Sequence, residues 1–256
     1  MFYLMNCLAF FFGAAIGSFL NVCIFRLPEK KSIVRPSSQC PYCHHPIRFY
    51  DNIPIISFAV LGGKCRDCLG KISWRYPLVE LITALLSLLL FLKFGFSPDF
   101  FVFFIFTAVL IVITFIDLDH QIIPDVLTLP GIPLFFLAAV FIIKVPWLEA
   151  LLGLLIGGGV LFLIAFVYEL ISKREGMGGG DIKLLAMIGG FLGWKSLIFV
   201  LLFSSFTGAI IGVTAMMIKK QDMKYAVHFG PFLSAAAVAY IFWGDYFMRL
   251  FFGEYY

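Results

Sequence analysis

Charged residues are scarce in this chain. They make up 13% of its 256 residues, while hydrophobic residues reach 62% and the mean hydropathy is +1.01. Soluble proteins carry about 25% charged residues, and one globular core of this size cannot bury so much apolar surface. A soluble enzyme and a disordered chain are therefore excluded, and the composition predicts an all-α polytopic membrane protein.

Several common signals are also missing. The apolar start, residues 2–25, has no basic segment before it and no Ala-x-Ala site, so we expect a retained helix and no cleaved signal peptide. No Gly-x-Gly-x-x-Gly motif follows a predicted strand, so we expect no soluble nucleotide-binding fold. No Ser-His or Cys-His pair is placed for nucleophilic catalysis. We expect no nucleic-acid partner.

Long apolar runs define the organisation of the chain. A membrane-crossing helix needs about 20 apolar residues, and eight runs meet or approach this length. The sixth run, of roughly 11 residues, is too short to cross unaided. The eight expected helices are residues 3–25, 78–94, 99–116, 126–143, 148–171, 182–192, 196–218 and 229–251.

The positions of Lys and Arg favour eight helices over seven. Basic residues prefer cytoplasmic loops, and an eight-helix chain with both termini outside places 15 of its 19 Lys and Arg residues inside. The longest polar stretch is then cytoplasmic. We expect a first transmembrane helix at residues 1–25, a small cytoplasmic domain at residues 26–77 and a transmembrane domain at residues 78–256.

Two Cys-x-x-Cys pairs lie in this polar stretch. Cys40-Pro-Tyr-Cys43 and Cys65-Arg-Asp-Cys68 have the spacing of two knuckles that bind one zinc ion through four thiolates. Disulfides or free thiols are the alternative, and a cytoplasmic location disfavours disulfides. Four thiolates leave no position for water, so the zinc would be structural. The neighbouring His44 and His45 could replace one cysteine.

Two acidic residues stand near helix ends, where the membrane makes charge costly and a functional role is the default hypothesis. Asp117 follows the third apolar run, and Asp181 follows the fifth. Two helices separate them, so both acids return to the same membrane face. Two such carboxylates can share a proton, with one acting as base toward water while the other polarises a carbonyl. This is the chemistry of an aspartic protease.

Glycines precede the second acid. Gly178 and Gly180 tolerate φ > 0 and allow another backbone to approach closely, as an extended peptide lying across the site would require. Asp181 could also be the N-cap of the sixth helix, since Asp favours that position. The two roles are compatible.

Other polar residues near helix ends have simpler interpretations. Capping is favoured for Asp125 at the start of the fourth helix. Asp119 and His120 could be interfacial. Glu80, a few residues into the second helix, could cap that helix or pair with Arg75.

With these residues identified, the chain resembles the bacterial type IV prepilin peptidases, Gly-x-Gly-Asp aspartic proteases that are often also N-methyltransferases. The resemblance runs nearly from end to end. It is carried by Gly17-Ser18-Phe-Leu-Asn21, Arg26-Leu-Pro28, the two Cys pairs, Asn52-Ile-Pro54, Ser73-Trp-Arg75-Tyr-Pro77-Leu-Val-Glu80, the stretch from Asp117 to Pro124-Asp125, Gly178-x-Gly180-Asp181 and Phe229-Gly230-Pro231-Phe232.

The resemblance implies an enzyme of the bacterial inner membrane. Its catalytic pair would be Asp117 and Asp181, cutting type IV prepilins or type II secretion pseudopilins after Gly and before Phe at the cytoplasmic face. The new amine would then be methylated with S-adenosylmethionine. The partners would be these membrane-inserted substrates and the lipid bilayer.

Further site residues follow from the same resemblance. The candidates for methyl transfer, at the margins of the cytoplasmic loop, are Glu80, Asn21 and Arg75. The residues expected to support the substrate or the loop are Gly178, Gly180 and Asp125. A presenilin-like protease would share the Gly-x-Gly-Asp motif but lack the Cys₄ loop. A transporter would typically show broken helices in matching halves of the chain, and the sequence has no such symmetry.

Overall fold

The structure is a computed structural model that describes residues 2–172, 178–219 and 229–253. Within these ranges every regular element is a helix, and the only β pairing is two isolated bridges, Gln39 to Pro46 and Lys64 to Lys71. The elements in chain order are α1 (Phe2–Arg26), η1 (Phe49–Asn52), α2 (Ile56–Val60), α3 (Arg75–Phe94), α4 (Pro98–His120), α5 (Asp125–Ala138), η2 (Ala139–Ile143), α6 (Trp147–Ser172), α7 (Gly179–Leu192), α8 (Trp194–Lys219) and α9 (Phe229–Phe252).

All eight expected helices are present in the described residues, and the all-α membrane fold is confirmed. Six of them are long and apolar enough to cross a membrane: α1, α3, α4, α5 with η2, α6 and α8. Helical structure extends beyond the apolar runs, most clearly where α3 begins at Arg75, α4 ends at His120 and α7 begins at Gly179. Asp117 therefore lies in the last turn of α4 and not in a loop after it.

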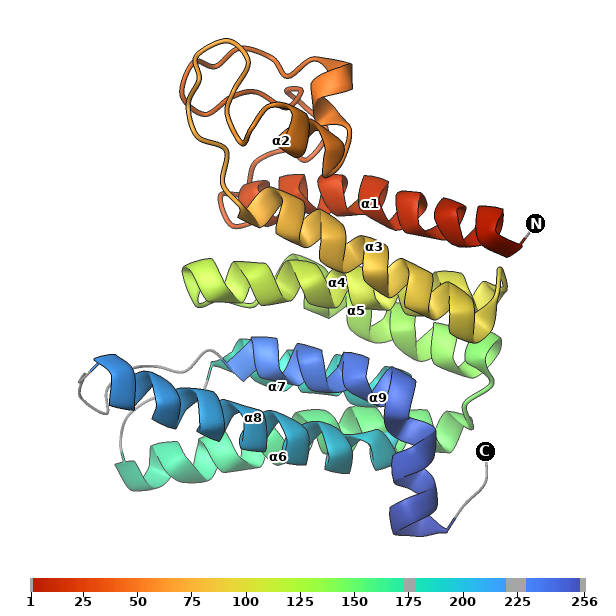
Figure 1. Ribbon diagram of the computed structural model, residues 1–256. Helices are drawn as coiled ribbons and strands as arrows, with labels where there is room; N and C mark the ends of the chain where they lie inside the picture. The colour runs from red at the N-terminus through yellow and green to blue at the C-terminus, as the bar shows by residue number, and fades with distance from the viewer. Residues whose placement is uncertain (1, 173–177, 220–228, 254–256) are drawn as a thin grey trace. The chain divides into compact units, whose positions relative to one another are not determined.

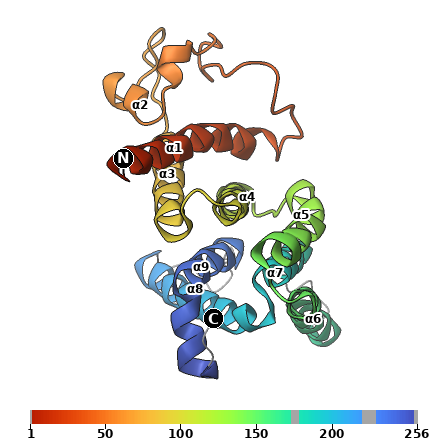
Figure 2. The ribbon, with the colours of Figure 1, turned by 90° about the vertical axis from the view of Figure 1, so that its right-hand side faces the viewer.

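Helix α7 is shorter than the others. Its 14 residues rise about 21 Å, which is less than the hydrocarbon core of about 30 Å. All residues from Leu184 to Phe191 are buried, and α7 contacts α5, α6, α8 and α9 (Figure 2). Protein neighbours, and not lipid, surround this short helix.

Glycines allow the backbones of α6 and α7 to come into direct contact. A Cβ added to Gly153 would lie 2.0 Å from the carbonyl oxygen of Gly189, and one added to Gly157 would lie 2.5 Å from that of Leu185. Real Cβ atoms do not approach a carbonyl so closely, so a larger side chain would push the helices apart. Small residues serve this purpose in many membrane helices.

The chain divides into two compact units, Met1–Val112 and Ile113–Tyr256. In the first unit α1 packs on α3 (Figure 1), where a Cβ at Gly13 would lie 2.5 Å from the Cβ of Ser87. Residues 27–74 lie beyond the C-terminal end of α1 and the N-terminal start of α3 (Figure 1). They contain both Cys-x-x-Cys pairs.

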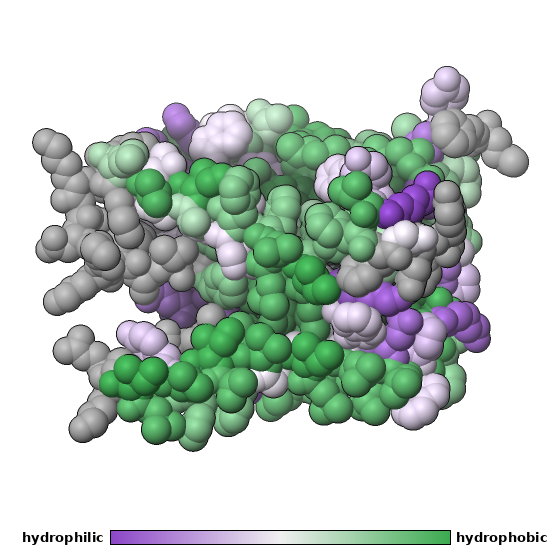
Figure 3. Space-filling model, turned by 90° about the horizontal axis from the view of Figure 1, so that it is seen from below, coloured by the Kyte–Doolittle hydropathy of each residue, from purple (hydrophilic) through white to green (hydrophobic). Residues whose placement is uncertain are grey.

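The second unit presents an apolar surface. The face seen in Figure 3 is hydrophobic over most of its area. Large exposed side chains on the helices of this unit include Phe162 and Leu170 on α6 and Leu202 and Phe206 on α8, each at least 60% exposed. An exposed apolar area of this extent is compatible with lipid as the surrounding solvent.

Candidate active site and metal centre

Asp117 is buried near the end of α4, with 6% of the residue exposed. The first turn of α9 lies against it, because a Cβ added to Gly230 would lie 2.7 Å from Asp117 Oδ2. Glycine at position 230 therefore leaves room for this carboxylate. A buried acid in a membrane helix is costly and marks a functional site by default.

Asp181 is the third residue of α7. The N-cap of this helix is Gly178, and the N–H of Asp181 donates to the carbonyl oxygen of Gly178 at 3.1 Å. The interpretation of Asp181 as the N-cap is therefore wrong, although an acid in the first turn still interacts favourably with the helix dipole. Its Oδ1 atom is buried and has no hydrogen-bond partner among the described residues. Such an oxygen is costly, so helix capping does not explain Asp181.

The two acids belong to the same unit and their carboxyl groups interact electrostatically. Repulsion between neighbouring carboxylates is relieved when the pair binds one proton, and the proton then belongs to the pair. One ionised and one protonated carboxyl group is the arrangement that acid–base hydrolysis needs. The pairing of Asp117 with Asp181 stays a prediction, drawn from the even number of intervening helices.

The glycines before Asp181 differ in their surroundings. A Cβ added to Gly180 would lie 2.7 Å from the Cβ of Ile123, so the segment before α5 presses on the first turn of α7. Gly178 has open space around it, with Asp181 Oδ2 at 3.9 Å from the added Cβ. Neither glycine has a positive φ. Close approach explains Gly180, and nothing in the structure explains glycine at position 178.

Asp125 is an ion-pair partner. Helix α5 begins at Asp125 without a side-chain capping bond, so the capping interpretation is wrong, although the acid still complements the helix dipole. Lys183 Nζ instead donates to Asp125 Oδ1 at 2.6 Å. This pair links the start of α5 to α7, two residues beyond Asp181. No local pattern in the sequence predicts Lys183 as the partner of Asp125, because pairing between separate helices depends on tertiary structure.

Asp119 lies at the end of α4, at the opposite end from Asp125 of the segment that connects α4 to α5. It is exposed together with His120 at the end of α4, as interfacial residues would be. The structure thus separates three neighbouring acids by environment: Asp117 is buried, and Asp119 and Asp125 are exposed.

The four cysteines between α1 and α3 converge. The sulfur atoms of Cys40 and Cys68 are 3.7 Å apart. A tetrahedral zinc ion with Zn–S bonds of about 2.3 Å holds its sulfur ligands about 3.8 Å apart, so this spacing fits a metal ion. A disulfide needs about 2.0 Å, and all the cysteines are free. The sulfur atoms that lie within 4.8 Å of one another are those of Cys40, Cys43, Cys65 and Cys68.

Backbone N–H groups of the first knuckle point at its first sulfur atom. Burial raises the pKa of the Cys40 thiol, but hydrogen bonds from the backbone of Cys43 and Tyr42 and from neighbouring cysteines outweigh it and lower the pKa to about 7. These donors favour the thiolate, which is the form that binds metals. The cluster contains neither His44 nor His45, so the four cysteines are the candidate ligands.

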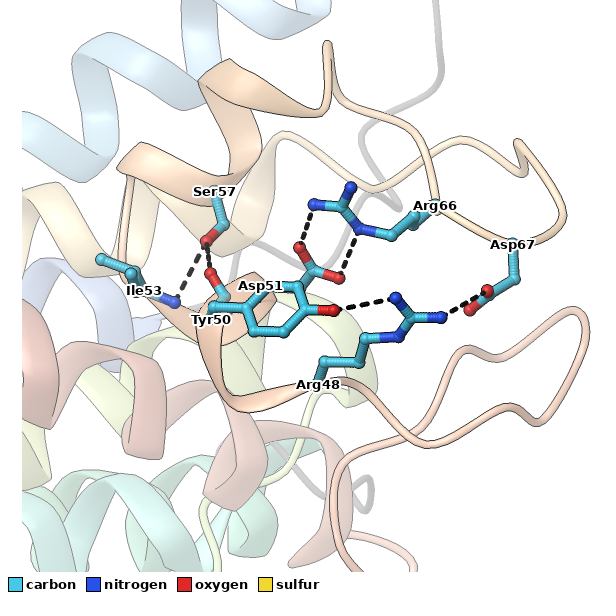
Figure 4. A network of polar contacts seen from close by, with 7 residues as sticks. All are labelled: Arg48, Tyr50, Asp51, Ile53, Ser57, Arg66 and Asp67. Carbon is cyan, nitrogen blue, oxygen red and sulfur yellow. Dashed lines mark hydrogen bonds and ion pairs between the residues drawn. The ribbon is translucent and has the colours of Figure 1, made fainter.

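An ionic network joins the two knuckles (Figure 4). Arg66, from the second knuckle, donates two hydrogen bonds to Asp51 at 2.9 and 2.6 Å, a bidentate geometry. The Arg66 guanidinium holds the pKa of Asp51 below its usual value. Arg48, which follows the first knuckle, donates to the hydroxyl of Tyr50 at 2.8 Å and pairs with Asp67 at 3.7 Å.

Hydrogen bonds continue from this network toward α3. The hydroxyl of Ser57 donates to the carbonyl oxygen of Tyr50 at 3.0 Å and accepts from the N–H of Ile53 at 3.1 Å (Figure 4). The N–H of Ile55 donates to Glu80 Oε2 at 2.7 Å. Ile55 has a φ of +63°, which is unfavourable for a β-branched residue, so this contact holds a strained turn.

Glu80 is buried in α3, with 8% of the residue exposed. Its carboxylate accepts a hydrogen bond from the N–H of Ile55. It does not cap α3, whose N-cap is Trp74. Pairing with Arg75 stays a prediction.

The two other candidates for methyl transfer lie near Glu80 in the folded protein. Asn21 is buried in α1 and donates from Nδ2 to the carbonyl oxygen of Tyr76 at 3.1 Å. Arg75 is half-buried at the start of α3. All three candidates thus belong to the region where α1 meets the first turns of α3.

Comparisons with known proteins agree over most of the chain. Residues 11–94 match the family described as Bacterial Peptidase A24 N-terminal domain, and residues 104–213 match the Type IV leader peptidase family. Relatives named prepilin leader peptidase/N-methyltransferase include those of Aeromonas salmonicida, Pseudomonas aeruginosa and Pseudomonas putida, at 40%, 38% and 36% identity. Each alignment covers 93% of this chain and 90% of the relative. No solved structure matches the chain.

Proposed function

Since the chain belongs to the type IV leader peptidase family, we propose that it cleaves the leader peptide of type IV prepilins or pseudopilins, after Gly and before Phe, and then methylates the new N-terminal residue. We propose Asp117 and Asp181 as the catalytic pair. The observation that carries this proposal is that Ile123 lies against both Gly180, next to Asp181, and Gly230, which lies against Asp117, within one unit. The buried Oδ1 of Asp181, which has no hydrogen-bond partner among the described residues, supports it further.

The proposed cleavage needs only water and the shared proton. The ionised carboxylate takes a proton from water as the water oxygen bonds to the scissile carbonyl carbon, while the protonated carboxyl gives its proton to the carbonyl oxygen. The C–N bond then breaks. The leaving amine takes a proton from the pair, and one hydroxyl of the intermediate returns a proton to it. The pair ends with one proton, as it began.

We propose that the glycine-rich turn borders the extended substrate and that Asp125 supports it. Gly178 has open space beside it, and Gly180 allows the segment before α5 to lie on α7. The Asp125–Lys183 ion pair ties the same two elements together. These contacts would fix the first turn of α7, and with it the position of Asp181.

Filling the space beside Asp117 should impair cleavage. Gly230→Ala would place a methyl group 2.7 Å from Asp117 Oδ2, so the carboxylate must leave its position in the pair. We expect a loss of cleavage of roughly 100-fold, as when a positioned acid–base group is displaced. The matched control is Gly208→Ala in α8, whose Cβ would meet its nearest neighbour at an ordinary 3.5 Å. Equal activity of the two variants in a prepilin cleavage assay would contradict this placement.

The chain is a multi-pass membrane protein, and we propose that it lies in the bacterial inner membrane with its catalytic pair at the cytoplasmic face. The clustering of Lys and Arg in alternate loops supports this orientation.

This orientation predicts a labelling pattern. In intact cells, Ser37→Cys should not react with a membrane-impermeant maleimide, whereas Pro146→Cys, between η2 and α6, should react. Both positions are exposed, so accessibility from one side of the membrane is the only intended difference. Labelling is measured by gel shift, and the native protein gives the baseline. If Ser37→Cys reacted and Pro146→Cys did not, the orientation would be opposite to the one proposed.

We propose that the four-cysteine cluster holds one structural Zn²⁺ and organises a domain at residues 26–77, separate from the peptidase domain at residues 78–256. The sulfur spacing and the thiolate-favouring N–H donors support zinc as the ion. Four thiolates complete its tetrahedral shell. The ion would therefore shape this domain without activating water.

For methyl transfer we propose S-adenosylmethionine as the donor and Glu80, Asn21 and Arg75 as the surrounding residues. When bound, it would supply the methyl group that the new pilin amine receives. A buried carboxylate such as that of Glu80 fits a positively charged donor. Asn21, through its bond to Tyr76, fixes the start of α3 beside this acid.

One assay tests both activities. Purified protein is incubated with a prepilin and S-adenosylmethionine, and the pilin N-terminus is read by mass spectrometry. We expect a product that begins with Phe and is heavier by one CH₂ group than the cleaved chain. Cleavage without methylation would favour a presenilin-like protease, and an uncut prepilin would contradict both assignments.

A further inference from the structure

One residue of the segment between α4 and α5 contacts two other helices. Ile123 is half-buried. A Cβ added to Gly180, in the first turn of α7, would lie 2.7 Å from Ile123 Cβ and 3.5 Å from its Cδ1. A Cβ added to Gly230, in the first turn of α9, would lie 3.1 Å from Ile123 Cδ1. The side chain of Ile123 thus packs on the backbone of both first turns.

The two glycines that Ile123 contacts stand beside the two proposed catalytic acids. Gly180 immediately precedes Asp181 in α7. The Cβ position of Gly230 lies 2.7 Å from Asp117 Oδ2, so Ile123 Cδ1 and the Asp117 carboxylate meet at the same glycine. All these residues belong to one compact unit. An apolar side chain therefore joins the turn that carries Asp181 to the turn that lies against Asp117.

The backbone on either side of Ile123 is held in place. Gln121 has a φ of +57°, and its N–H donates to the carbonyl oxygen of Asp117 at 2.9 Å, a common way to end a helix. Pro124 has a restricted φ, and its carbonyl oxygen accepts from the N–H of Thr128 at 3.2 Å. Ile123 is itself restricted at χ1 because it branches at Cβ. A stiff side chain thus stands on a fixed segment.

We propose that Ile123 is a positioning residue, which holds the first turns of α7 and α9 and so sets the distance between the carboxyl groups of Asp117 and Asp181. The proposal rests on the proposed peptidase function and assigns a role to a residue outside the pair. The interaction of two charges depends on their distance, so a shift of either turn changes how well the pair holds its shared proton. Ile123 has no polar side-chain atom, so it acts only through the two acids.

Shortening the side chain of Ile123 tests this role. A misplacement of about 1 Å in an active site can cost roughly 100-fold in rate, so Ile123→Ala should lower kcat for prepilin cleavage roughly 10- to 100-fold. KM should stay within about twofold, because the substrate still binds. Ile123→Val removes only the Cδ1 that contacts Gly230 and keeps the Cβ that contacts Gly180, so it should lose less activity. Ile123→Leu, which keeps the number of carbon atoms, should retain most of it.

The pH profile of kcat separates positioning from a loss of folded protein. The pair is active with one proton, so kcat falls when the pair binds a second proton in acid and when it loses the last one in base. Carboxyl groups that interact less strongly bind the second proton at higher pH and lose the last one at lower pH. Ile123→Ala should therefore narrow the pH range of high kcat from both sides. A smaller amount of folded protein would lower the rate equally at every pH.

The other titratable groups around the segment are the same in every variant. Helix α4 ends with the exposed Asp119 and His120. Helix α5 begins with Asp125, which pairs with Lys183 of α7 at 2.6 Å. The first turn of α9, residues 229–232, has no titratable side chain. A narrower profile after a change at Ile123 therefore reports on the aspartate pair.

Two controls separate positioning from general packing. Ile122→Ala is the matched control, because Ile122 is the preceding residue, is 47% exposed and is not among the nearest neighbours of either glycine. It should keep the native kcat and profile. Val200→Ala, at a fully buried position of α8, should lower the temperature of thermal unfolding without narrowing the profile.

The outcomes distinguish this proposal from the proposed function. If the native protein leaves prepilin uncut, or Asp117→Asn and Asp181→Asn cut it normally, the peptidase function falls and this role falls with it. If those tests support the function but Ile123→Ala keeps the native kcat and profile width, only the positioning role is overturned. A raised KM with unchanged kcat would make Ile123 a substrate contact and would also overturn the role. If Ile123→Ala does not fold, Ile123→Val carries the same test.

Discussion

Asp117→Asn and Asp181→Asn should each abolish prepilin cleavage while the protein remains inserted and folded. Asparagine keeps the size of the side chain but cannot hold or release the proton that the pair shares, and loss of such a group costs roughly a thousandfold or more in rate. The measurement is the initial rate of prepilin cleavage by purified protein. Thermal unfolding of each variant verifies that the loss is chemical.

The neighbouring acids provide the control for this experiment. Asp119→Asn and Asp125→Asn should keep most of the activity, because both residues are exposed. Asp125 forms an ion pair with Lys183, and such pairs contribute only about 0–1 kcal/mol. Normal cleavage by Asp117→Asn with loss in Asp125→Asn would identify Asp125 as the partner of Asp181. Normal cleavage by all four variants would disprove the protease assignment.

Replacing any one of the four clustered cysteines with serine should release the metal and loosen residues 27–74. Structural zinc contributes roughly 10–16 kcal/mol to the folding of small peptides at neutral pH, far more than other contacts in this region supply. We expect one zinc per chain in the native protein by elemental analysis, and less in each variant. Limited proteolysis should then cut residues 27–74 first and leave the apolar helices intact.

Cys7→Ser is the matched control, since Cys7 is an exposed residue of α1 outside the cluster. It should keep zinc and protease resistance. Some cleavage of prepilin should persist in the zinc-free variants, because no cysteine of the cluster belongs to the aspartate pair. Native protein prepared without chelator and found to contain no zinc would refute the metal assignment.

The sequence predicted those features that depend on composition and order along the chain. Apolar runs predicted all eight membrane-domain helices, including the short α7, because lipid requires each one to satisfy its backbone internally. Counting the helices between Asp117 and Asp181 predicted that the two acids return to one face, and both belong to one compact unit. The spacing of the cysteines predicted a cluster that the sulfur positions match. None of these inferences depends on which helices pack against one another.

Features that depend on tertiary contacts were missed or misread. Asp125 was interpreted as a cap but pairs with Lys183, and the N-cap role expected for Asp181 belongs to Gly178. Glu80, for which capping was one expected role, does not cap α3 and accepts a backbone N–H from a turn 25 residues earlier. Side-chain partners across helices leave no periodic signal, so only the folded chain reveals them.

The shortness of α7 has a consequence for how the protein is made. With 14 residues, α7 is a poor substrate for the insertion machinery, since it is too short to cross the hydrocarbon core alone. Its contacts with α5 and α6 come from residues translated before it, so these helices can receive α7 as it leaves the ribosome. Gly230, which lies against Asp117, belongs to α9, so the surroundings of Asp117 are complete only after α9 has been translated.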